Sequence, residues 1–203
     1  CEHGDIHGII GQNVAVTCDD NGEVVGSLQN FTSGSGYWFK TFGLGYDFTY
    51  SVPEVNNLSR DITKRLAIPY EFQYNQSTKQ AFYFIKDLEL LTNEVEDGDL
   101  LLAYNGNEIV GARFWAGEYT DVPVMGYDGS ERTLSYCQEG DIPEFKLLKK
   151  STGELLSLSL DNIPVWNDLG IEKISLSEIA LLPESISLGQ AYPNPFNPTT
   201  RLD

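Results

Sequence analysis

Short apolar runs separated by glycine, asparagine and aspartate are the feature that most constrains the fold of this chain. Aromatic and β-branched residues gather in runs such as NVAVTC, GYWFKTF and QAFYFIKDL, which have the length and composition of strands. No window of a dozen residues carries the apolar spacing of an amphipathic helix. The sequence therefore predicts an all-β fold built from β-sandwich-like (immunoglobulin-like) modules.

Two stretches predict β-hairpins and resemble each other. They are GQNVAVTCDDNGEVVGSL, which starts at Gly11, and GDLLLAYNGNEIVGAR, which starts at Gly98. Each runs from an apolar strand through a turn rich in Asn and Gly to a second strand ending in Val-Gly. Asn and Gly tolerate the positive φ of tight hairpin turns. The likeness indicates either an internal repeat or two independent hairpins.

A change of composition near residues 60–70 indicates a domain boundary. We expect an N-terminal β module over 1–66, a second β-sandwich-like module over 67–182, and a linker-like tail over 183–203. Within the second module, the segment VPVMGYDGSERTLSYCQEGDIPEF is expected to be a long, loop-rich connection. The periodic signal fades after LDNIPVWNDLGIEKISLSEIALLPESISLGQ. With 203 residues, of which 41% are hydrophobic, the chain can bury a core.

The strong negative charge narrows the classes of partner. Thirteen Lys and Arg residues face thirty Asp and Glu residues, which gives a formal charge of −17. Such a surface repels phosphate backbones, so we expect no nucleic-acid partner. No apolar run reaches the roughly 18 residues of a helical membrane span, so we expect no membrane span.

The three cysteines, Cys1, Cys18 and Cys137, match neither a zinc site nor a redox C-x-x-C pair. We predict a disulfide between Cys18 and Cys137, which would tie the two halves of the chain together. The alternative is three unpaired and mostly buried cysteines.

The C-terminal stretch AYPNPFNPTTRLD is unsuited to a packed core, because each proline removes a backbone donor and favours extended geometry before it. LPESISLGQAYPNPFNPTT resembles the start of the type A C-terminal sorting domain on cargo of the bacterial type IX secretion system. The family's sorting domain continues for several more strands, whereas this chain ends at Asp203. The residues that carry the match most specifically are Tyr192, Pro193, Asn194, Pro195, Phe196, Asn197, Pro198 and Thr199, followed by Thr200.

This resemblance implies export, recognition of the tail by the secretion machinery, and a location outside the bacterial cell or on its outer surface. More weakly, the rest of the chain resembles a region that precedes such tails in large exported proteins. IIGQNVAV, GDLLLAYNGNEIVGARFW and DIPEFKL carry this second resemblance. It implies a β-rich display or adhesion module and brings no catalytic residues with it.

The sequence offers little for catalysis. Histidine occurs only as His3 and His7, close to the first residue, and no G-x-S-x-G elbow accompanies them. We therefore predict that the protein is not an enzyme.

Acidic residues concentrate in predicted turns such as CDDNGE, VEDGD and YDGSE. Local capping of turns by Asp explains this placement, and structural calcium is the alternative. The candidate calcium ligands are Asp19, Asp20, Asp97, Asp99 and Asp128, and no other cofactor is expected.

Tryptophans supply the candidate ligand platform. Trp38, Trp115 and Trp166 could each stack on a sugar ring if one strand face is exposed, because alternate residues of a strand face opposite sides. The alternative is that all three pack in the core or at its edge.

Together these observations predict a non-enzymatic, exported cell-surface or extracellular protein that works in adhesion or as a structural subunit. Self-association through strand addition at exposed sheet edges is its expected mode of assembly. The alternative is a carbohydrate-binding module of a secreted multidomain protein, with a surface glycan as its partner.

Overall fold

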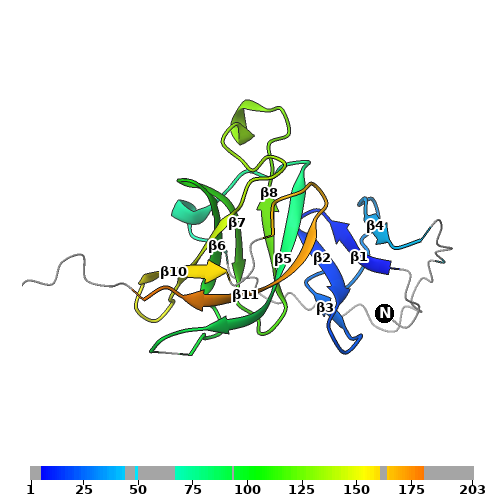
Figure 1. Ribbon diagram of the computed structural model, residues 1–203. Coiled ribbons are helices and arrows are strands. Elements are labelled where there is room, and N and C mark those ends of the chain that lie inside the picture. Colours follow the sequence, from blue (N-terminus) through cyan, green and yellow to red (C-terminus); the bar gives the residue numbers. More distant parts are fainter. Residues whose placement is uncertain (1–5, 44–48, 50–66, 93, 161–163, 181–203) are drawn as a thin grey trace, which may run out of the picture.

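The structure is a computed structural model that describes residues 6–43, 49, 67–92, 94–160 and 164–180 (Figure 1). Within these ranges the chain forms eleven strands and two short 3₁₀ turns, and the strands make two sheets that pack together. The predicted all-β, sandwich-like fold is confirmed. None of the described helical segments is long and apolar enough to cross a membrane.

The smaller sheet has the strand order β3-β2-β1-β4, with every pair antiparallel. The hairpin predicted from Gly11 is confirmed as β2 and β3. Its turn is fixed by Asp19, whose carboxylate accepts hydrogen bonds from the backbone N–H groups of Asn21 and Glu23, at 2.9 and 2.7 Å. The strands are β1 (Ile6–Gly11), β2 (Val14–Cys18), β3 (Val24–Gly26) and β4 (Trp38–Thr41).

The larger sheet has the order β7-β6-β9-β10-β11-β5-β8. Only the β5–β11 pair is parallel. The hairpin predicted from Gly98 is confirmed as β6 and β7, joined through Gly106 at φ 59°. The strands are β5 (Gln80–Glu89), β6 (Leu100–Asn105), β7 (Glu108–Phe114), β8 (Thr120–Met125), β9 (Glu144–Leu148), β10 (Leu155–Leu160) and β11 (Ile171–Glu178); the 3₁₀ turns are Tyr70–Phe72 and Glu131–Thr133.

The larger sheet curls until its two end strands meet. β7 and β8 stand at opposite ends of the hydrogen-bonded order, yet they contact each other. Gly111 of β7 lies against the backbone carbonyl of Pro123 in β8, and Arg113 Nε donates a hydrogen bond to the carbonyl of Asp121 at 2.8 Å. The concave side of the curled sheet encloses the main core.

Strand β5 is buried on both faces, and its residues alternate between two cores with the period of two that a strand imposes. One face contributes to the main core. The other face packs against the smaller sheet, so the two sheets share the core between them. The residues facing the main core are Ala81, Tyr83 and Ile85, and those facing the smaller sheet are Phe82 and Phe84, which meet Ile10, Ala15 and Ile171.

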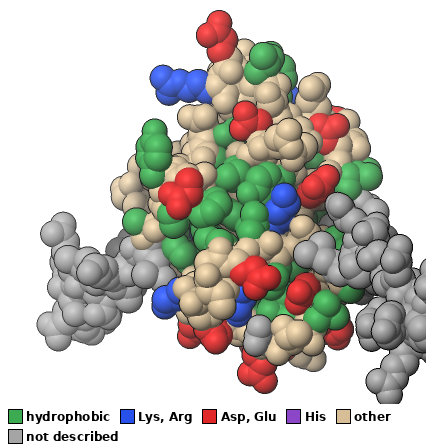
Figure 2. All heavy atoms as spheres, turned by 90° about the vertical axis from the view of Figure 1, so that its left-hand side faces the viewer, with side chains coloured by type: hydrophobic (Ala, Val, Ile, Leu, Met, Phe, Trp, Pro, Cys, Tyr) green, Lys and Arg blue, Asp and Glu red, His purple; other side chains and the backbone are tan. Residues whose placement is uncertain are grey.

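A third cluster covers the outer face of β6 and β7, where Leu100, Leu102 and Tyr104 pack with Ile68 and Phe72. Figure 2 views the molecule from the left-hand side of Figure 1 and shows hydrophobic side chains gathered near the centre of this face, with acidic side chains around them. Lys146 lies over the ring of Tyr104, with its Nζ 4.5 Å from the ring centroid.

One sequence-based expectation was wrong in part. The segment from Val122 was expected to be a loop-rich connection, but its first four residues, Val122–Met125, belong to β8. An end strand needs no backbone donor on its free side, so β8 tolerates Pro123.

The predicted disulfide between Cys18 and Cys137 is also wrong, because Cys137 is a buried, free thiol in the main core. Cys18 ends β2 and is disulfide-bonded, so its partner is a cysteine other than Cys137. The predicted boundary between residues 66 and 67 falls at the edge of the stretch 50–66, and the tail 183–203 lies wholly beyond residue 180. Both therefore lie outside the described residues.

Candidate functional site

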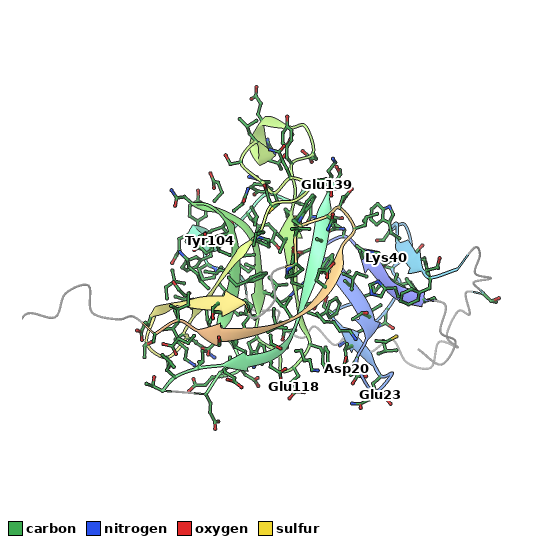
Figure 3. All side chains as sticks on the ribbon, in the orientation of Figure 1. Asp20, Glu23, Lys40, Tyr104, Glu118 and Glu139 are labelled. Carbon is green, nitrogen blue, oxygen red and sulfur yellow. The ribbon has the colours of Figure 1, made fainter. Side chains whose placement is uncertain are left out.

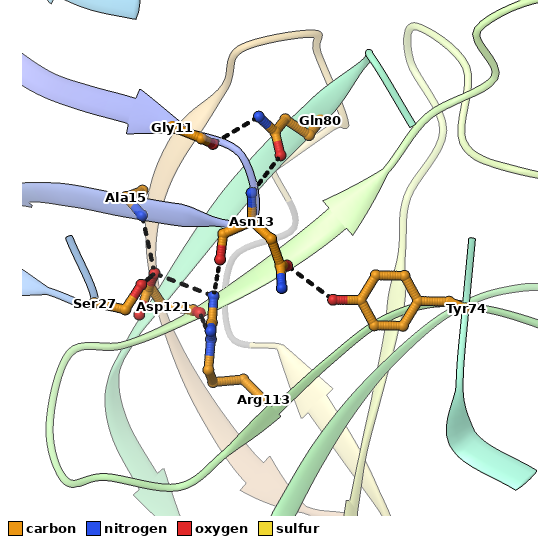
Figure 4. Close-up of polar contacts among 8 residues, drawn as sticks. All are labelled: Gly11, Asn13, Ala15, Ser27, Tyr74, Gln80, Arg113 and Asp121. Atoms are coloured by element: carbon orange, nitrogen blue, oxygen red, sulfur yellow. Dashed lines mark hydrogen bonds and ion pairs between the residues drawn. The ribbon is translucent and has the colours of Figure 1, made fainter. Parts of the chain in front are cut away.

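A polar network joins the two sheets at the seam where β7 and β8 meet (Figure 4). Its centre is Asp121, whose carboxylate accepts hydrogen bonds from Ala15 N at 3.2 Å and Ser27 Oγ at 2.6 Å. Arg113 Nη2 lies 3.5 Å from the same carboxylate oxygen and donates to the carbonyl of Asn13 at 2.8 Å. The network therefore fixes the smaller sheet to the larger one.

The β1–β2 turn enters this network through Asn13, a non-glycine residue held at φ 57°. Its backbone N–H donates to Gln80 Oε1 at 3.3 Å, and Gln80 Nε2 donates to the carbonyl of Gly11 at 2.9 Å. Tyr74 donates its hydroxyl hydrogen to Asn13 Oδ1 at 2.8 Å. Gln80 and Arg113 of the larger sheet, together with Tyr74 before β5, thus hold one turn of the smaller sheet.

Burial raises the pKa of Asp121, and the nearby Arg113 guanidinium and the donors around the carboxylate only partly oppose this effect. A buried carboxyl of raised pKa is a common sign of a catalytic acid. Here, however, its partners are structural groups of two packed sheets, so we assign it a structural role.

A surface groove of about 510 Å³ lies beside the C-terminal half of β5. Its apolar lining, which includes Leu88, Val95 and Trp115, packs onto the main core. Its polar lining is exposed and mostly acidic. The lining residues are Lys86, Asp87, Leu88, Glu89, Leu90, Glu94, Val95, Trp115 and Glu118.

The groove follows from the early end of the β5–β8 ladder. Pairing stops at Ile85 and Thr120, after a hydrogen bond from Tyr119 N to the Ile85 carbonyl at 2.7 Å. Tyr119 is held at φ 60° and Gly117 at φ 102°, so the chain turns away from β5. Among the described residues, Asp87–Glu89 therefore pair with a neighbouring strand, β11, on one side only, and Lys86 lies in a bulge of that pairing.

A buried ion pair lies next to the groove and is hydrogen-bonded to two of its lining residues. Lys149 Nζ lies 2.5 Å from Asp99 Oδ2, and the two side chains are 3% and 0% exposed. Lys149 also donates to the carbonyl of Glu94 at 2.8 Å, and Trp115 N donates to the carbonyl of Asp99 at 2.8 Å. The pair thus positions two residues of the groove.

The carboxyl of Asp99 stays charged despite its burial. Burial raises its pKa, but hydrogen bonds from the backbone of Glu96 and Lys150 and from the Lys149 ammonium outweigh that effect and leave the pKa below its usual value.

Lys86, the one cation of the groove lining, is already engaged. Its Nζ lies 2.5 Å from Asp20 Oδ2 in the β2–β3 turn, which also pairs with Lys173 at 3.3 Å. Figure 3 shows Asp20 and Glu118 on the same lower side of the molecule. The remaining carboxylates of the groove keep their negative charge largely uncompensated.

The three predicted platform tryptophans have different environments. Trp166 is 1% exposed and donates its indole N–H to the carbonyl of Val124 at 3.0 Å, so its prediction as a platform was wrong. Trp38 is 47% exposed on β4, and Trp115 is half-buried in the groove. Trp38 lies in β4 of the smaller sheet, whereas Trp115 directly follows β7 of the larger sheet, and Trp38 is not part of the groove lining.

The five candidate calcium ligands are also dispersed. Asp19 and Asp20 lie in the β2–β3 turn, Asp97 and Asp99 precede β6, and Asp128 follows β8. Asp128 caps its own loop by accepting hydrogen bonds from Thr133 Oγ1 at 2.7 Å and Ser130 N at 3.1 Å. In the part of the chain that the structure describes, no three His, Cys, Asp or Glu side chains are placed to hold a metal ion together.

Of the two histidines, His3 lies outside the described residues. His7 packs its ring edge-on against Phe42, with centroids 5.1 Å apart. Burial, followed by the charges of Lys40 and Lys173, lowers its pKa.

The groove could not be predicted from the sequence. The open edge of β5 depends on the left-handed conformation of Tyr119, which residues other than glycine rarely adopt. Gly117, two residues earlier, was the only local signal of a turn. Comparison with protein-family models, with curated proteins and with solved structures found no match to this chain.

Proposed function

We propose that this chain is a non-enzymatic, exported bacterial protein of the cell surface or extracellular space, an adhesion or structural subunit that joins partners by strand addition. The observation that carries the proposal is the open edge of β5 at Lys86–Glu89, which borders the groove. An unpaired strand edge presents backbone donors and acceptors that a second extended chain can satisfy.

The form of the groove favours binding over catalysis. It is open at the surface, and its acidic side chains Glu89, Glu94 and Glu118 are exposed. A site that leaves its charged groups in water gives them little of the electrostatic advantage on which catalysis depends. Leu88, Val95 and Trp115 form the apolar floor of the groove, and its carboxylates form a charged rim. This is the usual layout of a contact surface.

The resemblance of the tail to a type IX sorting signal supports export and contact with the secretion machinery. The test is to express the whole chain, with an added export leader, in a bacterium that has this secretion system. The Asn and Pro residues from Pro193 to Pro198 are replaced by alanine in the matched variant. Appearance of the unaltered chain outside the cell, with the variant held inside, is expected. Equal export of the variant and the unaltered chain would contradict a role of this motif in export.

Carbohydrate binding is the second candidate, and the position of Trp115 favours it. A half-buried indole flanked by carboxylates can stack on a sugar ring while the carboxylates accept its hydroxyl hydrogens. The test is a glycan array with Trp115→Ala and, as control, Trp38→Ala. Binding lost only in Trp115→Ala, with the circular dichroism spectrum of the folded protein retained, would support it.

A further inference from the structure

We propose that the groove is the docking site for an extended, positively charged segment of a partner protein. The segment pairs with the backbone of β5 at Lys86–Glu89 and places its cationic side chains among the carboxylates of the rim. This inference rests on the proposed strand addition and adds the location of the site and the chemistry of its occupant.

The backbone provides the first contact. The open stretch of four residues is roughly 13 Å long at the rise of a β-strand, enough for a short strand to pair with it. Because β11 pairs with Asp87, Leu88 and Glu89 on the other side, this part of the edge is held in an extended conformation before any partner arrives, and Lys86 lies in a bulge of the same ladder. A partner therefore does not have to order this edge, which keeps the entropic cost of binding low.

The floor provides the second contact. Leu88 and Trp115 are half-buried and rest on the main core, so their exposed parts offer apolar surface at a fixed position. Successive side chains of an incoming strand point to opposite sides. One set would lie over this floor while the alternate set points to the rim.

The rim selects the charge of the occupant. Asp87, Glu89, Glu94 and Glu118 line the groove beside the floor, and Lys86 is already paired with Asp20. Lysine or arginine in the incoming segment would meet uncompensated carboxylates. A second copy of this chain is a poor source of that charge, because each copy carries −17 and like-charged copies repel each other.

A sugar would use only part of this site. Stacking on Trp115 and hydrogen bonds to carboxylates account for a glycan, but they leave the unpaired backbone edge of β5 without a role. A peptide strand uses the edge, the floor and the rim together, and for that reason we favour it.

The test is a titration of the full, isotope-labelled chain with a capped hexapeptide of alternating lysine and valine, followed by amide and indole NMR signals. We expect saturable shifts at Lys86–Leu90 and at the indole of Trp115. The triple variant Glu89→Gln, Glu94→Gln, Glu118→Gln should weaken binding about tenfold or more, and so should a rise from low to high salt.

The matched control is the triple variant Glu71→Gln, Glu108→Gln, Glu131→Gln, which removes the same charge from exposed positions that do not line the groove. It should bind the peptide within about twofold of the unaltered chain. A peptide of the same charge with proline replacing each valine cannot donate along the edge at those positions and should bind more weakly than the valine peptide.

Three outcomes would overturn the inference. They are no saturable shift at millimolar peptide, equal weakening by both triple variants, and saturation of the same signals by cellohexaose but not by peptide. Each leaves the export test of the tail unaffected, so failure of the docking site can be told apart from failure of the exported role.

Discussion

Gly111 of β7 lies so close to the carbonyl group of Pro123 in β8 that a β-carbon at position 111 would overlap the backbone oxygen. The neighbour is backbone, so it cannot move aside by changing rotamer. Closure of the curled sheet therefore depends on the absence of a side chain at this position.

Gly111→Ala should destabilise the protein by at least about 3 kcal/mol, or prevent folding, because overpacking against backbone forces the two strands apart. Chemical denaturation with intrinsic fluorescence measures the change. Gly36→Ala is the matched control, since a β-carbon there meets no atom within 4 Å. Equal stability of the two variants would contradict the close approach of β7 and β8.

Arg113→Met should lower the free energy of unfolding by about 3 kcal/mol, because it leaves the buried Asp121 carboxylate and the Asn13 carbonyl without their cationic donor. Hydrogen exchange should accelerate most in β1 and β2, which this side chain fixes to the larger sheet. Arg132→Met, at an exposed position, is the control and should change little. Uniform acceleration over all strands would argue against a local clamp.

Lys149→Met should cost about 3 to 5 kcal/mol, because it leaves the buried Asp99 charge unpaired. Lys150→Met, at the exposed neighbouring position, is the control for removal of one positive charge. Thermal unfolding of both variants at neutral pH measures the difference, and similar losses in the two would contradict a buried pair.

The same pair predicts a pH dependence. The pKa of Asp99 is lowered in the folded state, so its contribution is complete above the unfolded pKa of about 4 and is lost as pH falls through the folded value. Unfolding experiments between pH 5 and pH 3 should show this loss in the unaltered chain. In Lys149→Met the loss should shrink or reverse, since burial alone raises the pKa of that carboxyl.

The buried Trp166 and the exposed Trp38 should respond differently to the same substitution. Trp166→Phe removes the hydrogen bond to Val124 and leaves a small cavity, so it should cost about 2 kcal/mol. Trp38→Phe, at a position 47% exposed, should stay within about 0.5 kcal/mol of the unaltered chain. Reversal of this order in melting temperature would contradict the placement of the two indoles.

Cys137 should be unreactive in the folded protein. Burial, and then the charge of Asp141, raise the pKa of its thiol to about 12, so almost no thiolate exists at neutral pH. Iodoacetamide at pH 8 should leave Cys137 unmodified in native protein and modify it in denaturant, as read by peptide mass spectrometry. Rapid modification of the native chain would show that the thiol is accessible.

The sequence predicts the strands whose signal is local. The runs that became β2, β5 and β7 carry aromatic and β-branched residues at strand length, and the Asn-Gly turns mark the β2–β3 and β6–β7 hairpins. β8 was missed because Pro123 argues against a strand unless the strand is known to end a sheet. That knowledge comes only from the order of all seven strands.

The candidate site is less predictable for the same reason. Trp115 was among the predicted platform residues, but nothing local separates it from Trp166, which the fold buries. The groove forms only because Tyr119 ends one ladder while β11 continues along the other side of β5. Both conditions are tertiary and have no counterpart in local residue patterns.

The position of β11 within its sheet has a mechanical consequence. β11 is the last described strand of the chain, and it lies between β10 and β5 rather than at an end of the sheet. Tension applied along the chain after Glu178 would have to slide this strand past both neighbours at once, loading all of their hydrogen bonds in parallel. A strand at the end of the sheet would instead be peeled away one bond at a time, so the fold is built to resist pulling from this direction.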